Sequence, residues 1–151
     1  MPGSTQPADG SFVHLHVHSD YSMLDGAARV ADLFSGCAQS GMPAIAITDH
    51  GNTFGAYEFY KASKATGVKP IIGMEAYVTP KTHRSERKRV RWGDAKSGQA
   101  NGDDVSGGGA FTHMTLWAQD TAGMHNLFRL SSLASLEGYF YKPRVDRELL
   151  D

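Results

Sequence analysis

The feature that most constrains the fold of this chain is a short apolar run, AIAIT at residues 44–48, with turn-forming residues on both sides. Gly41 and Pro43 precede the run, and the polar sequence DHGN at residues 49–52 follows it. A strand made only of apolar residues has to be covered on both faces, which is typical of parallel sheets flanked by helices. The run therefore predicts a buried parallel strand in an α/β fold.

Helical and strand-like segments alternate around this run. Apolar residues recur at helical spacing over residues 30–38, and Gly41 is expected to cap that helix in a left-handed conformation. A second helix is expected over residues 54–66, with Tyr57 and either Phe54 or Tyr60 on its buried side. Residues 12–17, 71–78 and 111–118 read as strands and residues 121–137 as a helix. Alternating strands and helices with short connections predict parallel strands joined by crossovers.

The sequence FVHLHVHSDYSMLDG, residues 12–26, places His14, His16 and His18 at every second position and Asp25 soon after them. Alternate side chains of an extended strand share one face. Neutral imidazoles beside a carboxylate suit a divalent metal such as zinc or manganese. An ordinary half-buried strand is the alternative reading of such a motif. His14 lies deeper in the strand than the other two and is expected to be a hydrogen-bonded core residue.

Residue types that bind metals also occur at the ends of other predicted strands. Asp49 and His50 follow the run at residues 44–48, and Glu75 lies in the later half of the strand at residues 71–78. Functional groups collect at the carboxyl ends of parallel strands, so these residues are expected at one rim. His113 lies early in its strand. It reaches that rim only if the strand boundary is misplaced or the strand runs against its neighbours.

Pooled, these positions supply four imidazoles and two carboxylates: His16, His18, Asp25, His50, Glu75 and His113. Such a set exceeds the needs of one tetrahedral zinc and suits two or three bridged divalent metals. Metals so arranged supply a hydroxide nucleophile and stabilise both oxygens of a displacement at phosphorus, so phosphate ester hydrolysis is the predicted reaction. Asp49 is either a further ligand or the acceptor that fixes an imidazole tautomer.

Composition limits the partners and the compartment. The 151 residues fit one domain, and the formal net charge of -1 means that nucleic acid could be attracted only by a local basic patch. The single cysteine, Cys37, excludes an intramolecular disulfide and is expected in the core. No apolar stretch is long enough to predict a membrane segment, and residues 1–11 are expected to form a disordered tail. A soluble cytoplasmic protein is the resulting expectation.

The middle of the chain is first basic and then rich in glycine. Residues 81–91 carry six Lys or Arg against one Glu, and residues 97–109 are polar and glycine-rich without periodicity. Residues 81–110 are therefore expected to be a flexible insertion. The basic run is either a solvated loop or an arm that attracts phosphate beside the site. In the second case the residues that contact DNA are Arg87, Lys88, Arg89 and Arg91.

The segments HLHVHSDYSMLDG, GMPAIAITDHGN, GVKPIIGMEAYV and THMTLWA resemble the PHP (polymerase and histidinol phosphatase) domain family, and more narrowly the N-terminal part of bacterial replicative DNA polymerase III alpha subunits. The resemblance runs from residue 12 to the end, apart from the insertion. It implies a distorted (β/α)7 TIM-like barrel, of which residues 12–151 would be the N-terminal portion. It implies the same six metal ligands that the residues themselves suggest.

The resemblance also implies a function and partners. A family member of this kind is expected to hydrolyse DNA from the primer 3′ end as a 3′-to-5′ proofreading exonuclease with zinc or manganese, and to work with magnesium, further polymerase domains and replisome subunits. The family pattern continues with a cysteine and an Asp-x-His pair that are not in this chain, so a truncated chain with an incomplete site is expected. A metal-stabilised structural module without catalysis, or a stand-alone phosphatase such as a histidinol phosphatase, remain as alternatives.

Overall fold

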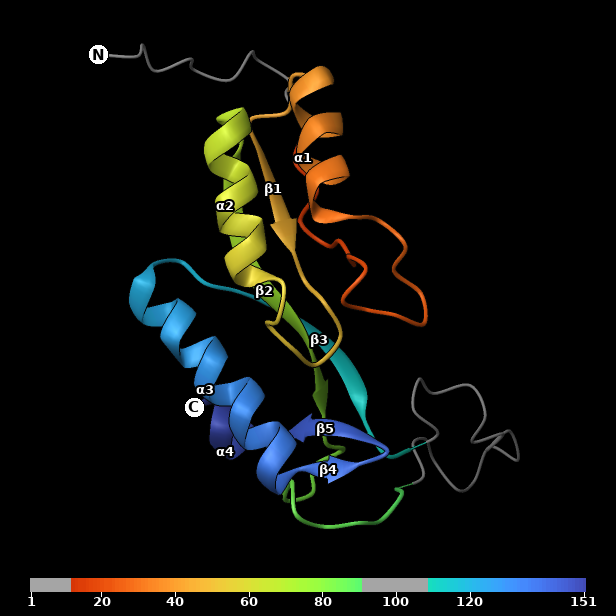
Figure 1. Ribbon diagram of the computed structural model, residues 1–151. Helices are drawn as coiled ribbons and strands as arrows, with labels where there is room; N and C mark the ends of the chain where they lie inside the picture. The colour runs from red at the N-terminus through yellow and green to blue at the C-terminus, as the bar shows by residue number, and fades with distance from the viewer. Residues whose placement is uncertain (1–11, 91–108) are drawn as a thin grey trace.

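The computed structural model describes residues 12–90 and 109–151, and these residues form a mixed α/β structure (Figure 1). This confirms the predicted fold class. The elements in chain order are α1 (Val30–Gln39), β1 (Ala44–Ile47), α2 (Ala56–Thr66), β2 (Lys69–Val78), β3 (Thr112–Trp117), α3 (Thr121–Glu137), β4 (Tyr139–Phe140), β5 (Lys142–Val145) and α4 (Arg147–Leu150).

Strand β2 is the centre of the sheet. Its first half pairs with β1 in parallel, from Ala44 opposite Lys69 to Ile47 opposite Ile72. Its second half pairs antiparallel with β3, and Tyr77 and Val78 also pair in parallel with β5. Because these two residues pair with both strands, β3 and β5 lie on opposite edges of β2. The crossover from β1 through α2 to β2 thus joins parallel strands, as predicted.

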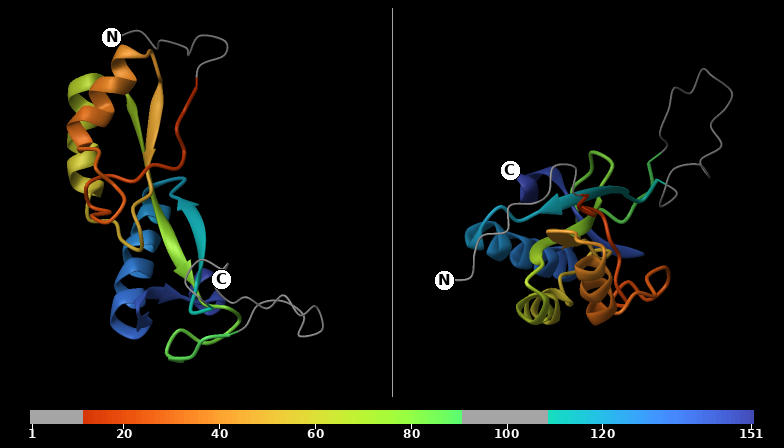
Figure 2. Two further views of the ribbon diagram at one scale, coloured as in Figure 1. Left: turned by 90° about the vertical axis from the view of Figure 1, so that its right-hand side faces the viewer. Right: turned by 90° about the horizontal axis from the view of Figure 1, so that it is seen from above.

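The apolar core has two main parts. Phe34 of α1 and Phe59 of α2 are fully buried against β1, with ring centroids 4.6 Å apart. Leu130 of α3 packs on Met74 of β2 and Val145 of β5. In the left view of Figure 2 the helices α1, α2 and α3 lie on one side of the strands. None of the helices within residues 12–90 and 109–151 combines the length and apolarity needed to cross a membrane.

The predicted first strand is wrong in detail. Residues 12–17 form no regular strand, and only an isolated bridge joins His14 to Ile45. The amides of Ala46 and Thr48 donate to the carbonyls of His14 and Val17 at 2.9 and 2.8 Å. The Val17 amide, however, donates to the Thr48 hydroxyl at 2.8 Å instead of a backbone carbonyl, which breaks the ladder. The segment still runs alongside β1.

Two predicted core positions are exposed. His14 is exposed because only an isolated bridge joins its segment to β1, and its ring stacks edge-on against Phe12 instead of packing into the core. In α2, Tyr57 is 73% exposed and Phe59 is fully buried. The helix turns Ala56, Phe59 and Ser63 inward rather than its tyrosines. By contrast, Cys37 is buried as expected.

Within the expected insertion the structure describes residues 81–90 and 109–110, and the first of these stretches is tied to α3 and α4 through Arg84. The Arg84 Nε donates to Glu137 at 2.7 Å, and its Nη1 donates to Asp146 at 3.2 Å. Asp146, 4% exposed, also accepts from the amides of Arg84 and Leu149, and so caps α4 as predicted. Residues 91–108, with Arg91, lie outside the described residues, as does the tail at residues 1–11.

Asp146→Asn is expected to destabilise the chain most at neutral pH. Burial alone would raise the pKa of Asp146, but the amides of Arg84 and Leu149 and the Arg84 guanidinium lower it. The contribution of such a carboxylate is present above its unfolded pKa of about 4 and is lost as the pH falls below that value. We expect a loss of about 1–3 kcal/mol in the free energy of unfolding near pH 7 and a smaller loss near pH 3, measured by urea denaturation. Equal losses at both pH values would contradict this role.

Candidate metal centre

Glu75, in the second half of β2, is surrounded by imidazoles. Its Oε2 lies 2.5 Å from His16 Nε2 and 2.6 Å from His18 Nε2, and its Oε1 is hydrogen-bonded to His113 Nδ1. Burial alone would raise the pKa of Glu75, but the hydrogen bonds from these three histidines outweigh burial and lower the pKa to about 2. The carboxylate is therefore ionised at neutral pH.

His50 follows the end of β1 and connects Glu75 to Asp25. Its Nε2 lies 2.7 Å from Asp25 Oδ2, and its Nδ1 lies 3.7 Å from Glu75 Oε1, too far for a hydrogen bond. The hydrogen bond from His50 lowers the pKa of Asp25. Within the described residues, the buried His50 Nδ1 has no hydrogen-bond partner. A buried polar atom without a partner is costly unless something else satisfies it.

The backbone around His50 fixes its ring. The Gly51 amide donates to the Glu75 carbonyl at 2.8 Å. The φ of Gly51 is 64°, in a backbone region that residues other than glycine rarely adopt. A Cβ at Gly51 would lie 2.8 Å from the Tyr77 ring. Tyr77 in turn stacks on His50, with centroids 5.8 Å apart and planes 13° from parallel. The close packing of Gly51 and Tyr77 thus sets the direction of the imidazole.

The direction of β3 brings His113 to the same place. β3 runs antiparallel to β2, with His113 opposite Tyr77 and Thr115 opposite Glu75. The start of β3 therefore lies beside the end of β2. Of the two explanations left open for the early position of His113, the reversed strand is the one that the structure bears out.

All six residues predicted as ligands come together, and we call His16, His18, Asp25, His50, Glu75 and His113 the Glu75 cluster. They form three groups, and within each group the candidate ligand atoms lie within 4.8 Å of one another. The groups are His16, His18 and Glu75; His18, Asp25 and His50; and His50, Glu75 and His113. Each pair of groups shares one residue. Adjacent cations bridged by common ligands need such a set, and the unpartnered His50 Nδ1 fits the same requirement.

Asp49 has a different role from either of the two expected. Its carboxylate, 1% exposed, accepts hydrogen bonds from the amide and hydroxyl of Ser19 at 2.7 and 2.8 Å and from the Ser22 hydroxyl at 2.7 Å. The Ser22 oxygen also accepts the His50 amide at 3.1 Å. Asp49 belongs to none of the three ligand groups in the Glu75 cluster. It fastens the loop after His18 to the end of β1, and so aligns two of the cluster histidines.

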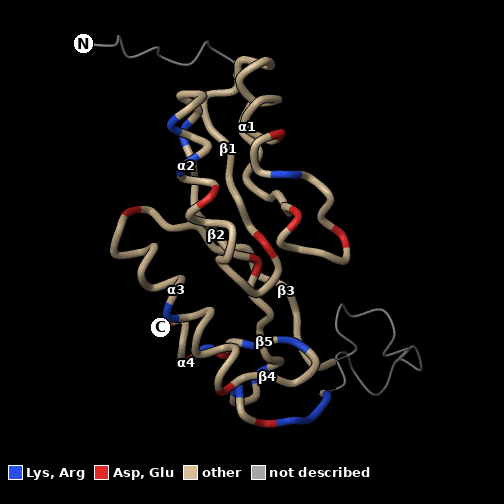
Figure 3. Tube along the Cα trace, viewed as in Figure 1, with Lys and Arg blue, Asp and Glu red and all other residues tan. Residues whose placement is uncertain are grey.

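The charges around the cluster are divided between two sides. Figure 3 shows acidic positions on the loop before α1 and at the end of β1, and basic positions on β5 and on the segment before the undescribed residues. Of the predicted DNA contacts, Arg87, Lys88 and Arg89 are exposed there, and Arg91 is not described. Lys88 forms an ion pair with Glu86, and the Arg89 guanidinium lies 4.9 Å from the Tyr141 ring centroid.

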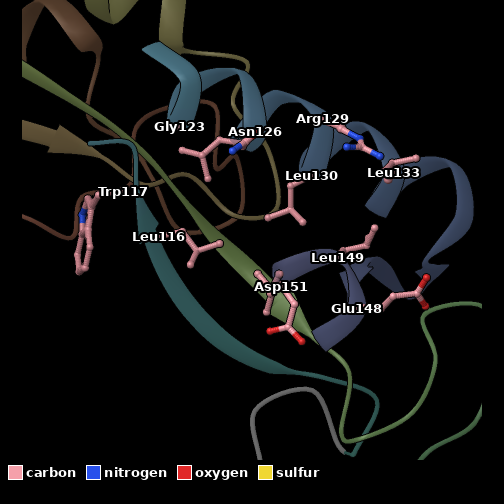
Figure 4. A pocket seen from close by; sticks show the side chains of 12 residues that line it. Leu116, Trp117, Gly123, Asn126, Arg129, Leu130, Leu133, Glu148, Leu149 and Asp151 are labelled. Atoms are coloured by element: carbon pink, nitrogen blue, oxygen red, sulfur yellow. The ribbon is translucent and has the colours of Figure 1, made fainter. Parts of the chain in front are cut away.

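A separate pocket lies between β3, α3 and α4 and is lined by both apolar and polar side chains (Figure 4). Its lining includes Leu116, Leu130 and Leu149 and none of the histidines of the Glu75 cluster. A further His and carboxylate group, His83 with Asp146 and Glu148, lies near this end of the molecule. The Arg84 guanidinium already lies 3.2 Å from Asp146 and 3.5 Å from Glu148 and supplies the positive charge that a metal would bring. Of the two, the Glu75 cluster is therefore the candidate metal centre.

Several residues beside the cluster were not singled out in the sequence. Tyr21, Tyr139, Tyr141 and Lys142 line a cavity together with Asp25 and His50 of the cluster. The sequence YFYKPR at residues 139–144 contains three of them, and its density of aromatic and basic residues was the available signal. Three residues of that segment thus lie beside the candidate metal site.

Comparison with known proteins agrees with this geometry. The PHP domain family matches residues 14–151. DNA polymerase III subunit alpha of Saccharopolyspora erythraea is 57% identical over 143 residues, which are 92% of this chain and 12% of that protein. The same subunit of Mycobacterium tuberculosis is 50% identical over 151 residues, covering 99% of this chain and 12% of that protein. The chain therefore spans only a small part of the length of these relatives.

A solved structure has a similar fold. The crystal structure of a proposed metal-dependent phosphoesterase from Bifidobacterium adolescentis aligns with a TM-score of 0.52 at 19% identity, over 85% of this chain and 34% of that chain. At this identity the likeness concerns the fold alone. It agrees with a partial TIM-like fold.

Proposed function

The chain belongs to the PHP domain family, and from this premise we propose that the Glu75 cluster holds two or three divalent cations and hydrolyses phosphodiester bonds. The observation that carries the proposal is the set of three ligand groups that share His18, His50 and Glu75 pairwise. Zinc or manganese suits a site so rich in imidazole. Bound there, such cations supply a hydroxide nucleophile near neutral pH and stabilise both the attacking and the leaving oxygen.

The residues of the chain have separate tasks in this proposal. Glu75, in contact with three histidines and present in two of the three ligand groups, would help to hold the cations and neutralise part of their charge. His50, aligned by the Tyr77 ring and by Asp25, would offer its unpartnered Nδ1 to the site. Asp49 would act only through Ser19 and Ser22, by holding the loop that carries His18 in place. Since these positions are fixed by the backbone, little reorganisation would be needed on loading.

The proposed substrate is the 3′ end of DNA, and the proposed reaction is 3′-to-5′ proofreading exonuclease cleavage. The high identity to DNA polymerase III alpha subunits supports a setting in DNA replication. In that setting the chain would work in the cytoplasm as part of a longer protein, with further polymerase domains and replisome subunits as partners and magnesium for polymerisation. Arg87, Lys88 and Arg89, on the exposed basic side, would attract the DNA backbone.

His50→Ala is expected to lower hydrolysis by at least about 100-fold, since loss of even an indirect metal partner commonly costs about 10- to 100-fold and His50 would be a direct one. The measurement is cleavage of a mismatched, 5′-labelled primer and of bis(p-nitrophenyl) phosphate by the chain, and by the longer protein that contains it, with manganese or zinc. His14→Ala is the matched control, because His14 is exposed and belongs to no ligand group. Unchanged primer and ester with the unsubstituted protein would overturn the proposal.

A structural role for the metals is the competing function, and one observation favours it. The imidazoles and carboxylates come from segments far apart in the chain, such as His16 and His113, so bound cations would hold them together. A thermal melt before and after chelation distinguishes the two roles. A lower melting temperature in chelator without hydrolysis under any condition would favour the structural module. Hydrolysis of a small phosphate monoester, with DNA left intact, would favour a stand-alone phosphatase such as a histidinol phosphatase.

A further inference from the structure

We propose that the β4–β5 hairpin beside the Glu75 cluster is a stacking platform for an unpaired nucleobase, with Tyr141 as its main contact. The proposal deepens the function proposed above and rests on it, because the base would belong to the strand end presented to the cluster. It adds a binding subsite for the base, where the cluster itself could contact only phosphate.

The hairpin and the cluster face one cavity. Its lining includes Tyr21 and Asp25 from the loop after His18, His50 from the end of β1, and Tyr139, Tyr141 and Lys142 from the hairpin. Its volume is about 270 Å³. Pockets for whole drug-sized ligands are typically about 300–1,000 Å³, so this cavity suits one ring system rather than a longer ligand. A single terminal base is of that kind.

The backbone at Tyr141 is the second observation. Phe140 pairs with Lys142 across the hairpin, so Tyr141 alone forms its tip, and its φ is 64°. A bulky residue in this region is an outlier, because its Cβ crowds the backbone, and glycine or asparagine would adopt the same turn more easily. The hairpin thus holds an aromatic ring at its tip in spite of backbone strain. Such strain is a feature of functional sites.

The tyrosines at the hairpin are largely open to solvent. Tyr139 and Tyr141 are each 60% exposed. The Arg89 guanidinium lies 4.9 Å from the Tyr141 ring centroid and covers one face of that ring. The Phe140 ring stands edge-on to the Tyr141 ring, with centroids 4.6 Å apart, and the exposed part of the Tyr141 ring is where a flat ligand would stack. Tyr77, by contrast, is 4% exposed and supports the cavity from behind, stacked on His50.

The charges fit a nucleic acid strand end in one orientation. Arg89 and Lys142 place positive charge at the hairpin, and Lys142 Nζ lies 5.6 Å from the Tyr77 ring centroid. Exposed tyrosines interleaved with cations are the usual means by which proteins hold single-stranded nucleic acid, since every base has a face that can stack. The base would lie on Tyr141 and the strand end would face Asp25 and His50, with Arg89 and Lys142 offsetting the negative charge of its phosphates.

The test is binding of a short single-stranded oligodeoxynucleotide, labelled at its 5′ end, to the complete chain in EDTA. Fluorescence anisotropy is measured for this oligonucleotide and for one whose 3′-terminal residue lacks its base. Tyr141→Ala is expected to bind the intact oligonucleotide about 5- to 150-fold more weakly, the range found for loss of one stacking ring. Tyr141→Phe, which keeps the ring, is expected to bind within about twofold of the unsubstituted chain.

Tyr141→Gly separates binding from folding. Glycine relieves the strain at a φ of 64°, so its melting temperature is expected to equal or exceed that of the unsubstituted chain, while binding weakens as in Tyr141→Ala. Tyr57→Ala is the matched control, because Tyr57 is an exposed tyrosine of α2 with Lys61 Nζ 5.6 Å from its ring centroid and lies outside the cavity. Its binding is expected to be unchanged.

Failure of this proposal can be told from failure of the proposed function. If the variants at Tyr141 bind as the unsubstituted chain does, or if removal of the terminal base leaves its affinity unchanged, the platform is overturned. Bis(p-nitrophenyl) phosphate carries no base, so its hydrolysis with manganese or zinc tests the Glu75 cluster alone. Absence of that hydrolysis would overturn the proposed function. The binding experiment is done without metal, so its result would still test the stacking platform.

Discussion

Glu75→Gln is expected to reduce the metal affinity of the chain by at least about 100-fold and to abolish its metal-dependent hydrolysis. The substitution keeps the size of the side chain and removes its charge. Glu75 takes part in two of the three ligand groups, and three histidines contact its carboxylate. An amide presents one oxygen and one nitrogen donor, so it cannot replace a carboxylate that accepts from imidazoles on both oxygens. The loss therefore affects the shared centre of the cluster.

Two measurements check this result. Metal content after dialysis should fall from two or three ions per chain to at most one, and the rise in melting temperature that metal gives the unsubstituted chain should disappear, since a ligand stabilises only the state that binds it. Glu148→Gln is the matched control, because Glu148 belongs to the other His and carboxylate group, where Arg84 Nη1 lies 3.5 Å from it. Equal metal content in Glu75→Gln and the unsubstituted chain would refute this role of Glu75.

Much of this site could be predicted because it depends on local patterns. Residue types that bind metals stand at the ends of apolar strands, and parallel strands end at a common rim. Helix ends were equally readable, since Gly41 and Gly67 adopt the left-handed conformation at φ values of 68° and 74°. That the six residues hold metal stays a prediction, but the meeting of His16, His18 and His50 at Glu75 was expected from strand order and residue type.

The direction of β3 could not be read from its sequence. Side chains alternate with a period of two in either direction, so the pattern of residues 111–118 is the same for a parallel and an antiparallel strand. The only signal was an inconsistency in the predicted site. His113 lies early in its strand, whereas the other strands were expected to contribute metal ligands from their carboxyl-terminal ends. Antiparallel pairing with Tyr77 opposite His113 removes it. An unexplained position was thus informative about topology.

Contacts between distant segments were missed for a related reason. The partners of Asp49 are Ser19 and Ser22, and nothing local to Asp49 identifies them. The β4–β5 hairpin has strands of two and four residues and Tyr141 at its tip, where turn rules expect glycine or asparagine. A hairpin that breaks the usual turn chemistry gives no turn signal. Tyr141, which replaces the usual turn residue and so removes the turn signal from the sequence, is also the residue proposed to bind the base.

Arg144→Met is expected to cost at least about 4 kcal/mol of unfolding free energy. Arg144 is fully buried, and its guanidinium donates to four carbonyl groups rather than to a carboxylate. These carbonyls belong to Arg84, Glu86, Ala110 and Gly138. Burial lowers the pKa of Arg144, and the nearby charge of Arg87 lowers it further. Burying the charged guanidinium is therefore unfavourable, and its hydrogen bonds offset this cost. Methionine would leave the acceptors unpaired, at about 1–3 kcal/mol for each that stays dry.

The same substitution should loosen the surface beside the metal site. Arg144 joins the segment of Arg84 and Glu86 to Gly138 at the start of the hairpin, so its loss should free both Arg89 and Tyr141. We expect a melting temperature lower by about 8 °C or more, at about 2–4 °C per kcal/mol, and earlier tryptic cleavage at Arg87 and Arg89. Arg147→Met, at an exposed arginine with an ion pair of 3.6 Å to Asp151, should melt within about 2 °C of the unsubstituted chain. A melting temperature for Arg144→Met equal to that of Arg147→Met would contradict this role. It would mean that water can replace the guanidinium, and that another contact holds the hairpin beside the Glu75 cluster.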